Sequence, residues 1–123
     1  MFPDAVAMGG YPIDIHSPDG AAMKHTHLTP GSWYSIPYRS LVTREAENLI
    51  VAGRCISVTH EACAAVRVTP IVMAMGQAAA TAAAIAISCG VKVRDVSPDQ
   101  VRRILDQNGA IIPGKEKAFE EIL

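Results

Sequence analysis

Two side chains suited to proton transfer, Asp14 and His16, lie two positions apart in the segment Tyr11–His16. Ile13 and Ile15 alternate with them, which is typical of a β-strand whose alternate residues point to one face. On a shared face a carboxylate can orient an imidazole, or both groups can face a substrate, so general acid–base chemistry is one interpretation. The other is structural, because a histidine on a strand is more often a hydrogen-bonded part of the fold.

Two further histidines, His25 and His27, invite a metal interpretation. They alternate in a KHTH stretch, so a strand would place both imidazoles on one side. Zinc, however, requires three or four ligands at set distances. The polar context between Gly20 and Pro30 is typical of a solvated loop. We therefore predict no metal site.

A dense set of polar groups follows the short apolar run Leu49–Ala52. This run has the pattern of a strand buried on both faces. Open α/β sheets bind ligands beyond the carboxyl ends of their strands. We therefore expect a ligand beside the loop that follows, which contains Gly53, Arg54, Cys55, Ser57, His60 and Glu61.

A helix is predicted to begin after Thr69 and Pro70 and to run from Ile71 to about Ser88. Threonine is a capping residue, and proline at the first helical position loses no hydrogen bond. Most of the side chains that follow are alanine, which favours close approach of another element or a ligand. Free N–H groups and the helix dipole at this start, with Arg67 just upstream, predict an anionic partner.

The same segment has two other interpretations. From Pro70 to Val91 it lacks charge and is long enough to cross a bilayer, for which about 20 apolar residues suffice. Its polar residues Gln77, Thr81 and Ser88 argue against a span, as do basic residues on both sides. We predict no membrane partner. A plain buried core helix without a ligand is the second alternative, and the pattern alone leaves it open.

The composition excludes several classes of partner and compartment. Half of the 123 residues are hydrophobic, 19% are charged, and the formal net charge is −1. Without a basic cluster the chain has no electrostatic footprint for nucleic acid. Its three cysteines are odd in number and lack CxxC spacing, which favours reduced thiols in a cytoplasmic protein.

The segments before Leu49 are predicted to contain strands, and the segments after the long helix are predicted to contain further helices. Residues 33–38 are a candidate edge strand because of Pro37, and a turn is expected at residues 17–20. Gly90 is predicted to end the long helix. A capping box at Ser97 begins another helix, which Gly109 ends. Residues 118–123 have the spacing of a short last helix.

Several motifs in this chain together resemble one family. They are GGYPIDIH from Gly9, IPYRSL from Ile36, AGRCIS from Ala52, THEA from Thr59, RVTP from Arg67, and MAMGQAA followed by a run of alanines. In this order they are similar to FAD-dependent oxidoreductases, bacterial flavoproteins distantly related to the flavoprotein subunits of fumarate reductases. The resemblance covers most of the chain.

The resemblance implies a fold class, an α+β fragment with three parts. Residues 1–40 would be part of a substrate-side β-sheet. Residues 41–92 would be the carboxyl-terminal strand, loop and helix of a FAD-binding, Rossmann-like α/β domain. Residues 93–123 would be a helical tail.

The resemblance also implies an activity, hydride transfer between a small organic substrate and FAD. It makes Asp14, His16, Arg39 and His60 candidates for substrate binding or proton transfer. The expected FAD-binding residues are Gly53, Arg54, Cys55, Ser57, Arg67, Thr69, Pro70, Gly76 and Gln77.

One expected part of a FAD-binding domain is missing from these residues. Such a domain needs a glycine-rich strand–turn–helix, with an acidic residue about 20 positions later. Because the sequence contains neither, we expect a carboxyl-terminal fragment that is inactive alone and that pairs with an amino-terminal FAD-binding domain or with itself. The alternative is a non-enzymatic module that oligomerises through a buried alanine-rich helix.

Overall fold

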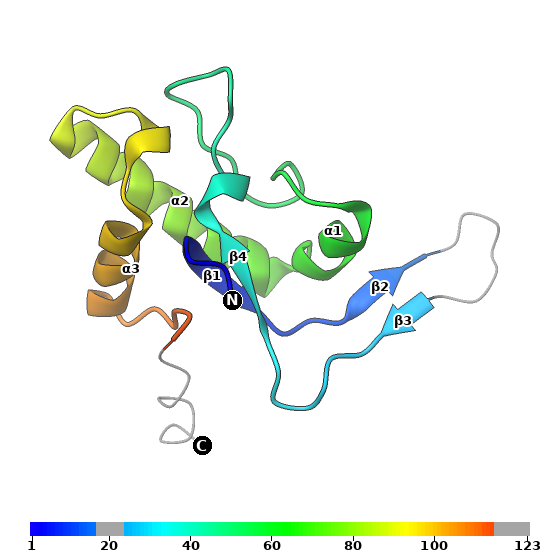
Figure 1. Cartoon of the computed structure of the whole chain (residues 1–123). Coiled ribbons are helices and arrows are strands. Elements are labelled where there is room, and N and C mark those ends of the chain that lie inside the picture. Colours follow the sequence, from blue (N-terminus) through cyan, green and yellow to red (C-terminus); the bar gives the residue numbers. More distant parts are fainter. Residues whose placement is uncertain (17–23, 115–123) are drawn as a thin grey trace.

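The computed structural model describes residues 1–16 and 24–114, which form a small α+β fold (Figure 1). The turn expected at residues 17–20 and the last helix expected at residues 118–123 lie outside the described residues. The strands are β1 (Ala5–Gly9), β2 (Ile13–Ile15), β3 (Lys24–Thr26) and β4 (Tyr34–Pro37). The helices are α1 (His60–Val66), α2 (Thr69–Cys89) and α3 (Pro98–Gln107), with 3-10 turns η1 (Tyr38–Ser40) and η2 (Val93–Asp95).

The strands form two separate antiparallel ribbons rather than one sheet. β1 pairs with β4, and this ribbon lies against α2 and α3. β2 pairs with β3, and Figure 1 shows this second ribbon extending to the side where α1 packs on β2. The strands predicted near Tyr11–His16 and at residues 33–38 are confirmed in shorter form. The solvated loop predicted around His25 is wrong, because backbone pairing with β2 makes it a strand.

The strand predicted at Leu49–Ala52 does not form. Val42 and Ile50 make an isolated antiparallel bridge, and the Val51 amide donates to the carbonyl of Leu41 at 2.8 Å. Leu49 is largely exposed. A strand buried on both faces needs neighbours on both edges, and the described residues supply one short contact on one side. The described residues therefore contain no parallel sheet.

Helix α2 is the centre of the core. Its buried residues recur at helical spacing and pack with Val6, Ala7 and Ile36 of the β1–β4 ribbon. The opposite face is open, with Met73 and Ile87 exposed by 68% and 83%. Helix α2 is therefore a core helix that is buried on one face, and the alternative of a core helix without a ligand stays a prediction. The core-facing residues of α2 are Ile71, Met75, Ala78, Ala79, Ala82, Ile85 and Ala86.

Among the described residues, α2 alone is long and apolar enough to cross a membrane, by length and composition only. A core helix of a soluble protein passes the same criterion, and 39% of its most apolar stretch is buried within this chain. The prediction of no membrane partner therefore stays a prediction.

The helix ends follow the glycine and proline signals. Gly90, with a φ of 64°, ends α2 in the left-handed conformation, and Gly109 follows α3 with a φ of 76°. Ser97 precedes α3 as expected, but its side chain makes no capping bond, so the predicted capping box is wrong in this detail. Helix α3 buries Val101 and Leu105 against α2 and β1.

The burial of two tyrosines leads us to expect a loss of stability at alkaline pH. Burial raises the pKa of both Tyr34 and Tyr38 from 10 to about 12. Above pH 10 the phenols of the unfolded chain lose protons while the folded chain keeps them, so the free energy of unfolding should fall as the pH rises towards 12. Urea denaturation from pH 8 upwards measures this, and the fall should be smaller in Tyr38→Phe. An equal fall in both proteins would contradict the assignment.

Candidate functional site

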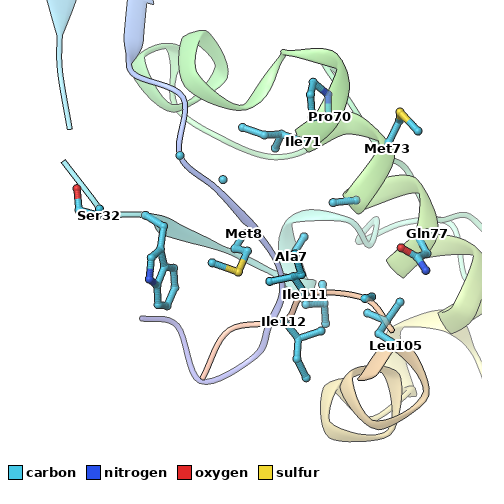
Figure 2. A pocket seen from close by; sticks show the side chains of 17 residues that line it. Ala7, Met8, Ser32, Pro70, Ile71, Met73, Gln77, Leu105, Ile111 and Ile112 are labelled. Atoms are coloured by element: carbon cyan, nitrogen blue, oxygen red, sulfur yellow. The ribbon is translucent and has the colours of Figure 1, made fainter. Parts of the chain in front are cut away.

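A groove of about 1090 Å³ lies beside the first two turns of α2 (Figure 2). Its volume is slightly above the usual range for small-molecule pockets, which is about 300 to 1,000 Å³. Strand β1, the Gly31–Trp33 segment and the chain after α3 form the other walls. Most lining side chains are apolar. They include Met8, Trp33, Ile71, Met73, Leu105 and Ile111, and Gln77 is a polar exception at the rim.

Two of the predicted FAD-binding residues, Pro70 and Gln77, line this groove. Thr69 and Gly76 lie on the same turns of α2. Gly76 is notable because an added Cβ there would meet no atom within 4 Å. Glycine inside a helix costs roughly 0.5 to 1 kcal/mol relative to alanine. Nothing in the described chain uses the space that this glycine leaves.

The start of α2 differs from the prediction in its capping. Val68 is the N-cap residue, and Thr69 is already in the first turn and makes no side-chain capping bond. The amides of Ile71 and Val72 both donate to the Val68 carbonyl, at 3.1 and 3.0 Å, so they are not free for an anion. Pro70 has no N–H group. The start of α2 therefore has fewer free N–H groups for binding an anion than the sequence predicts.

The loop after Ala52 meets the same end of α2 from another side. Gly53 has a φ of 83°, and an added Cβ would lie 3.3 Å from Val72. Glycine is therefore required both by the backbone conformation and by the close approach to α2. The Ser57 amide donates to the Ser40 carbonyl at 2.9 Å, which ties the loop to η1. The side chains of Arg54, Cys55 and Ser57 are exposed.

Arg67, predicted to bind the cofactor, points instead to Asp14 on β2. Its Nη2 donates to the Asp14 carbonyl at 3.3 Å and lies 3.8 Å from Oδ2 of the same residue. Its charge is therefore shared with a carboxylate within the chain. The role of Arg67 in binding the cofactor stays a prediction.

Asp14 is the centre of a cluster that draws on both strands of the second ribbon. Its Oδ2 accepts from the hydroxyl of Tyr11 at 3.3 Å. Its Oδ1 lies 3.6 Å from Nε2 of His16 and 3.7 Å from Nε2 of His25. The residue is 8% exposed. The predicted pairing of Asp14 with His16 is thus confirmed as proximity, and His25, which we had considered only as a metal ligand, joins it.

A second tyrosine connects this cluster to α1 and the groove. The Tyr34 hydroxyl donates to the Ala65 carbonyl at 2.9 Å and accepts a backbone hydrogen bond from Tyr11. Gly9, at the groove, approaches Tyr34 so closely that an added Cβ would lie 2.8 Å from its ring. These contacts fix the position of the Asp14 cluster relative to the groove.

The other two candidate catalytic residues lie elsewhere. Arg39 forms an ion pair with Asp4 and its guanidinium lies 4.8 Å from the centre of the Phe2 ring. His60 is the exposed first residue of α1. Neither contacts Asp14 among the described residues. In the same part of the chain, no group of three or more His, Cys, Asp or Glu side chains could hold a metal ion.

Sequence reasoning missed most of the groove. Met8, Gly9 and Trp33 come from segments that were predicted only as strands and turns, and no motif marked them as ligand-facing. The GG pair inside GGYPIDIH was an available signal, because glycine in a strand often marks a close approach of backbone or ligand.

Comparison with known proteins gives the class. The model of the family described as FAD dependent oxidoreductase matches residues 1–105, which is most of the chain. This chain therefore belongs to the FAD-dependent oxidoreductase family. Membership indicates a flavin-linked redox role with FAD as the cofactor. A search of curated proteins and a search of solved structures found no match.

Proposed function

We propose that the complete protein transfers a hydride between a small organic substrate and FAD, and that this chain forms one wall of the flavin site. In this proposal the groove beside α2 receives the flat ring system of the cofactor. When bound, FAD supplies the hydride acceptor or donor. The chain supplies the apolar surface, the rim amide of Gln77 and the nearby Asp14 cluster.

The chemistry of the groove carries this proposal. A phosphate would need free amides or an unpaired cation, whereas the Ile71 and Val72 amides and Arg67 already have partners. A large, mostly apolar ring suits a groove lined by Met8, Trp33 and other apolar side chains. The ring system is therefore a better occupant than the pyrophosphate, which we assign to residues outside this groove.

Gly76 supports the proposal independently. The residue leaves space that no described atom fills, at a cost to helix stability. A group outside the described residues that approaches α2 closely would explain why glycine occurs there. Gly76 lies three residues after Met73, which lines the groove, so this approach would be beside the groove.

The alternative, a non-enzymatic module that self-associates, is favoured by a specific observation. Ala80, Ala84 and Ile87 are exposed on α2 beyond the groove. Helices with small side chains can pack closely through such a face. Light scattering distinguishes the two functions, since a module would form a defined oligomer of this chain alone and would bind no flavin in any longer polypeptide.

We expect that the purified chain of 123 residues is colourless. The polypeptide extended by the upstream coding region should bind FAD in a one-to-one ratio, because it would add the dinucleotide-binding turn that this chain lacks. Flavin absorbance after gel filtration measures both. A stoichiometric yellow cofactor on the short chain alone, or none on the extended polypeptide, would contradict the proposal.

A further inference from the structure

The buried carboxylate of Asp14 has an oxygen without a hydrogen-bond partner. Its Oδ1 is shielded from solvent and accepts no hydrogen bond from any described residue. A buried acceptor left in this state destabilises the fold, so it calls for an explanation beyond stability. Two groups with a proton to offer lie near it, the imidazoles of His16 and His25 at 3.6 and 3.7 Å.

We infer that Asp14 and His25 form a carboxylate–imidazole dyad in which His25 is the base for proton transfer. In the ribbon, Asp14 and His25 are direct cross-strand partners. Cross-strand neighbours on one face lie close together and interact. The backbone pairing of β2 and β3 therefore holds this imidazole against the carboxylate.

His16 is held less firmly. Its side chain is 63% exposed and it follows the end of β2, whereas the His25 side chain is 34% exposed and belongs to β3. The His25 ring also stacks on that of His27, with 5.8 Å between the ring centres. A fixed imidazole loses less freedom when it reacts. His25 is therefore the better base of the two.

The orientation of the His25 ring defines which nitrogen reacts. Nε2 lies 3.7 Å from Oδ1 of Asp14, and so the negative charge favours the proton on this nitrogen. The separation exceeds a hydrogen bond, as is common in unliganded sites, where such contacts tighten only when the substrate binds. Nδ1 then keeps its lone pair and can accept a proton. Asp14 is a positioning residue, with Tyr11 and Arg67 holding it in turn.

A short segment of chain connects the dyad to the groove. Gly10 lines the groove, and four residues of extended chain from Gly10 to Asp14 span at most about 14 Å. This inference rests on the proposed function for its reaction. A substrate with an O–H or N–H group would give its proton to Nδ1 of His25, while the hydride from the adjacent carbon, with its electron pair, would pass to FAD. The substrate is then oxidised and the cofactor reduced.

The reactivity of His25 towards diethyl pyrocarbonate tests the dyad in the chain itself, without cofactor. The reagent acylates an unprotonated imidazole nitrogen, and mass spectrometry of peptides assigns each site. At a pH where both imidazoles are unprotonated, the carboxylate that holds the proton on Nε2 makes Nδ1 more nucleophilic, so we expect His25 to react about tenfold faster than His27. In Asp14→Asn this excess should disappear, and in the control Asp4→Asn it should remain.

A second measurement needs no variant, in case Asp14→Asn does not fold. Long-range proton–nitrogen spectra of the wild-type chain report which ring nitrogen carries the proton, and we expect Nε2 for His25. A proton on Nδ1, equal reactivity of His25 and His27, or faster reaction at His16 would each overturn the dyad. The outcome is independent of FAD binding by the extended polypeptide, so failure of the dyad and failure of the proposed function are distinguishable.

Discussion

Replacing Gln77 with tryptophan is expected to weaken FAD binding by the extended polypeptide strongly and to leave the fold of this chain intact. Gln77 is exposed at the rim of the groove, so a large ring at this position would occupy the space proposed for the cofactor. We expect the dissociation constant for FAD to rise by a factor of at least about 100, equivalent to roughly 2.7 kcal/mol. Flavin fluorescence titration measures the affinity, and circular dichroism measures the fold.

Ala84→Trp is the matched control for this change. Ala84 is also exposed on α2 but does not line the groove. The same side chain there should leave the dissociation constant unchanged. If both variants bound FAD like the wild type, the groove would not be the flavin site. If both lost it, a partner domain that covers the whole exposed face of α2 would be the better explanation.

Helices α2 and α3 could be predicted from the sequence because their signals are local, whereas α1 begins at His60, inside the segment predicted as a polar loop, and was missed. Pro70 and Pro98 mark helix starts, and Gly90 and Gly109 mark ends with positive φ, all properties of the residue itself. The exact N-cap of α2 was misplaced by one residue. Val68 takes the role expected of Thr69 because its backbone, not a side chain, accepts the first hydrogen bonds.

The strands were less predictable because pairing depends on residues distant in sequence. The polar stretch at His25 becomes β3 only through its ladder with β2. The apolar run Leu49–Ala52 has a strong strand pattern, yet the described residues give it no ladder on either side beyond the single bridge at Ile50. Propensity indicates what a segment can form, and tertiary neighbours decide what it does form.

Only part of the candidate site could be predicted from the sequence, because the site also depends on contacts between residues distant in sequence. Asp14 and His16 were found because their spacing is local. Arg67 was assigned to the cofactor on its position near the helix start, but its side chain reaches β2, and only the folded arrangement of α1 against β2 shows this. The groove is assembled from β1, the Trp33 segment, α2 and the residues after α3, which no single motif joins.

Replacing Met75 with alanine is expected to destabilise the chain by about 2 to 5 kcal/mol. Met75 is fully buried where α2 packs on the β1–β4 ribbon, so its truncation removes apolar contacts and leaves a cavity in the core. Urea denaturation followed by circular dichroism measures the change. The urea concentration at the midpoint of unfolding should fall. The slope of the unfolding free energy against urea concentration should not increase, because the surface exposed on unfolding is nearly the same.

Met73→Ala tests the opposite face of the same helix with the same substitution. Met73 is 68% exposed and lines the groove, so its truncation should alter stability by less than about 0.5 kcal/mol. In the extended polypeptide the order of effects should reverse: Met73→Ala should weaken FAD binding, and Met75→Ala, below its melting temperature, should not. Equal losses of stability would show that α2 is rotated relative to the ribbon, which would remove both the core and the groove as described.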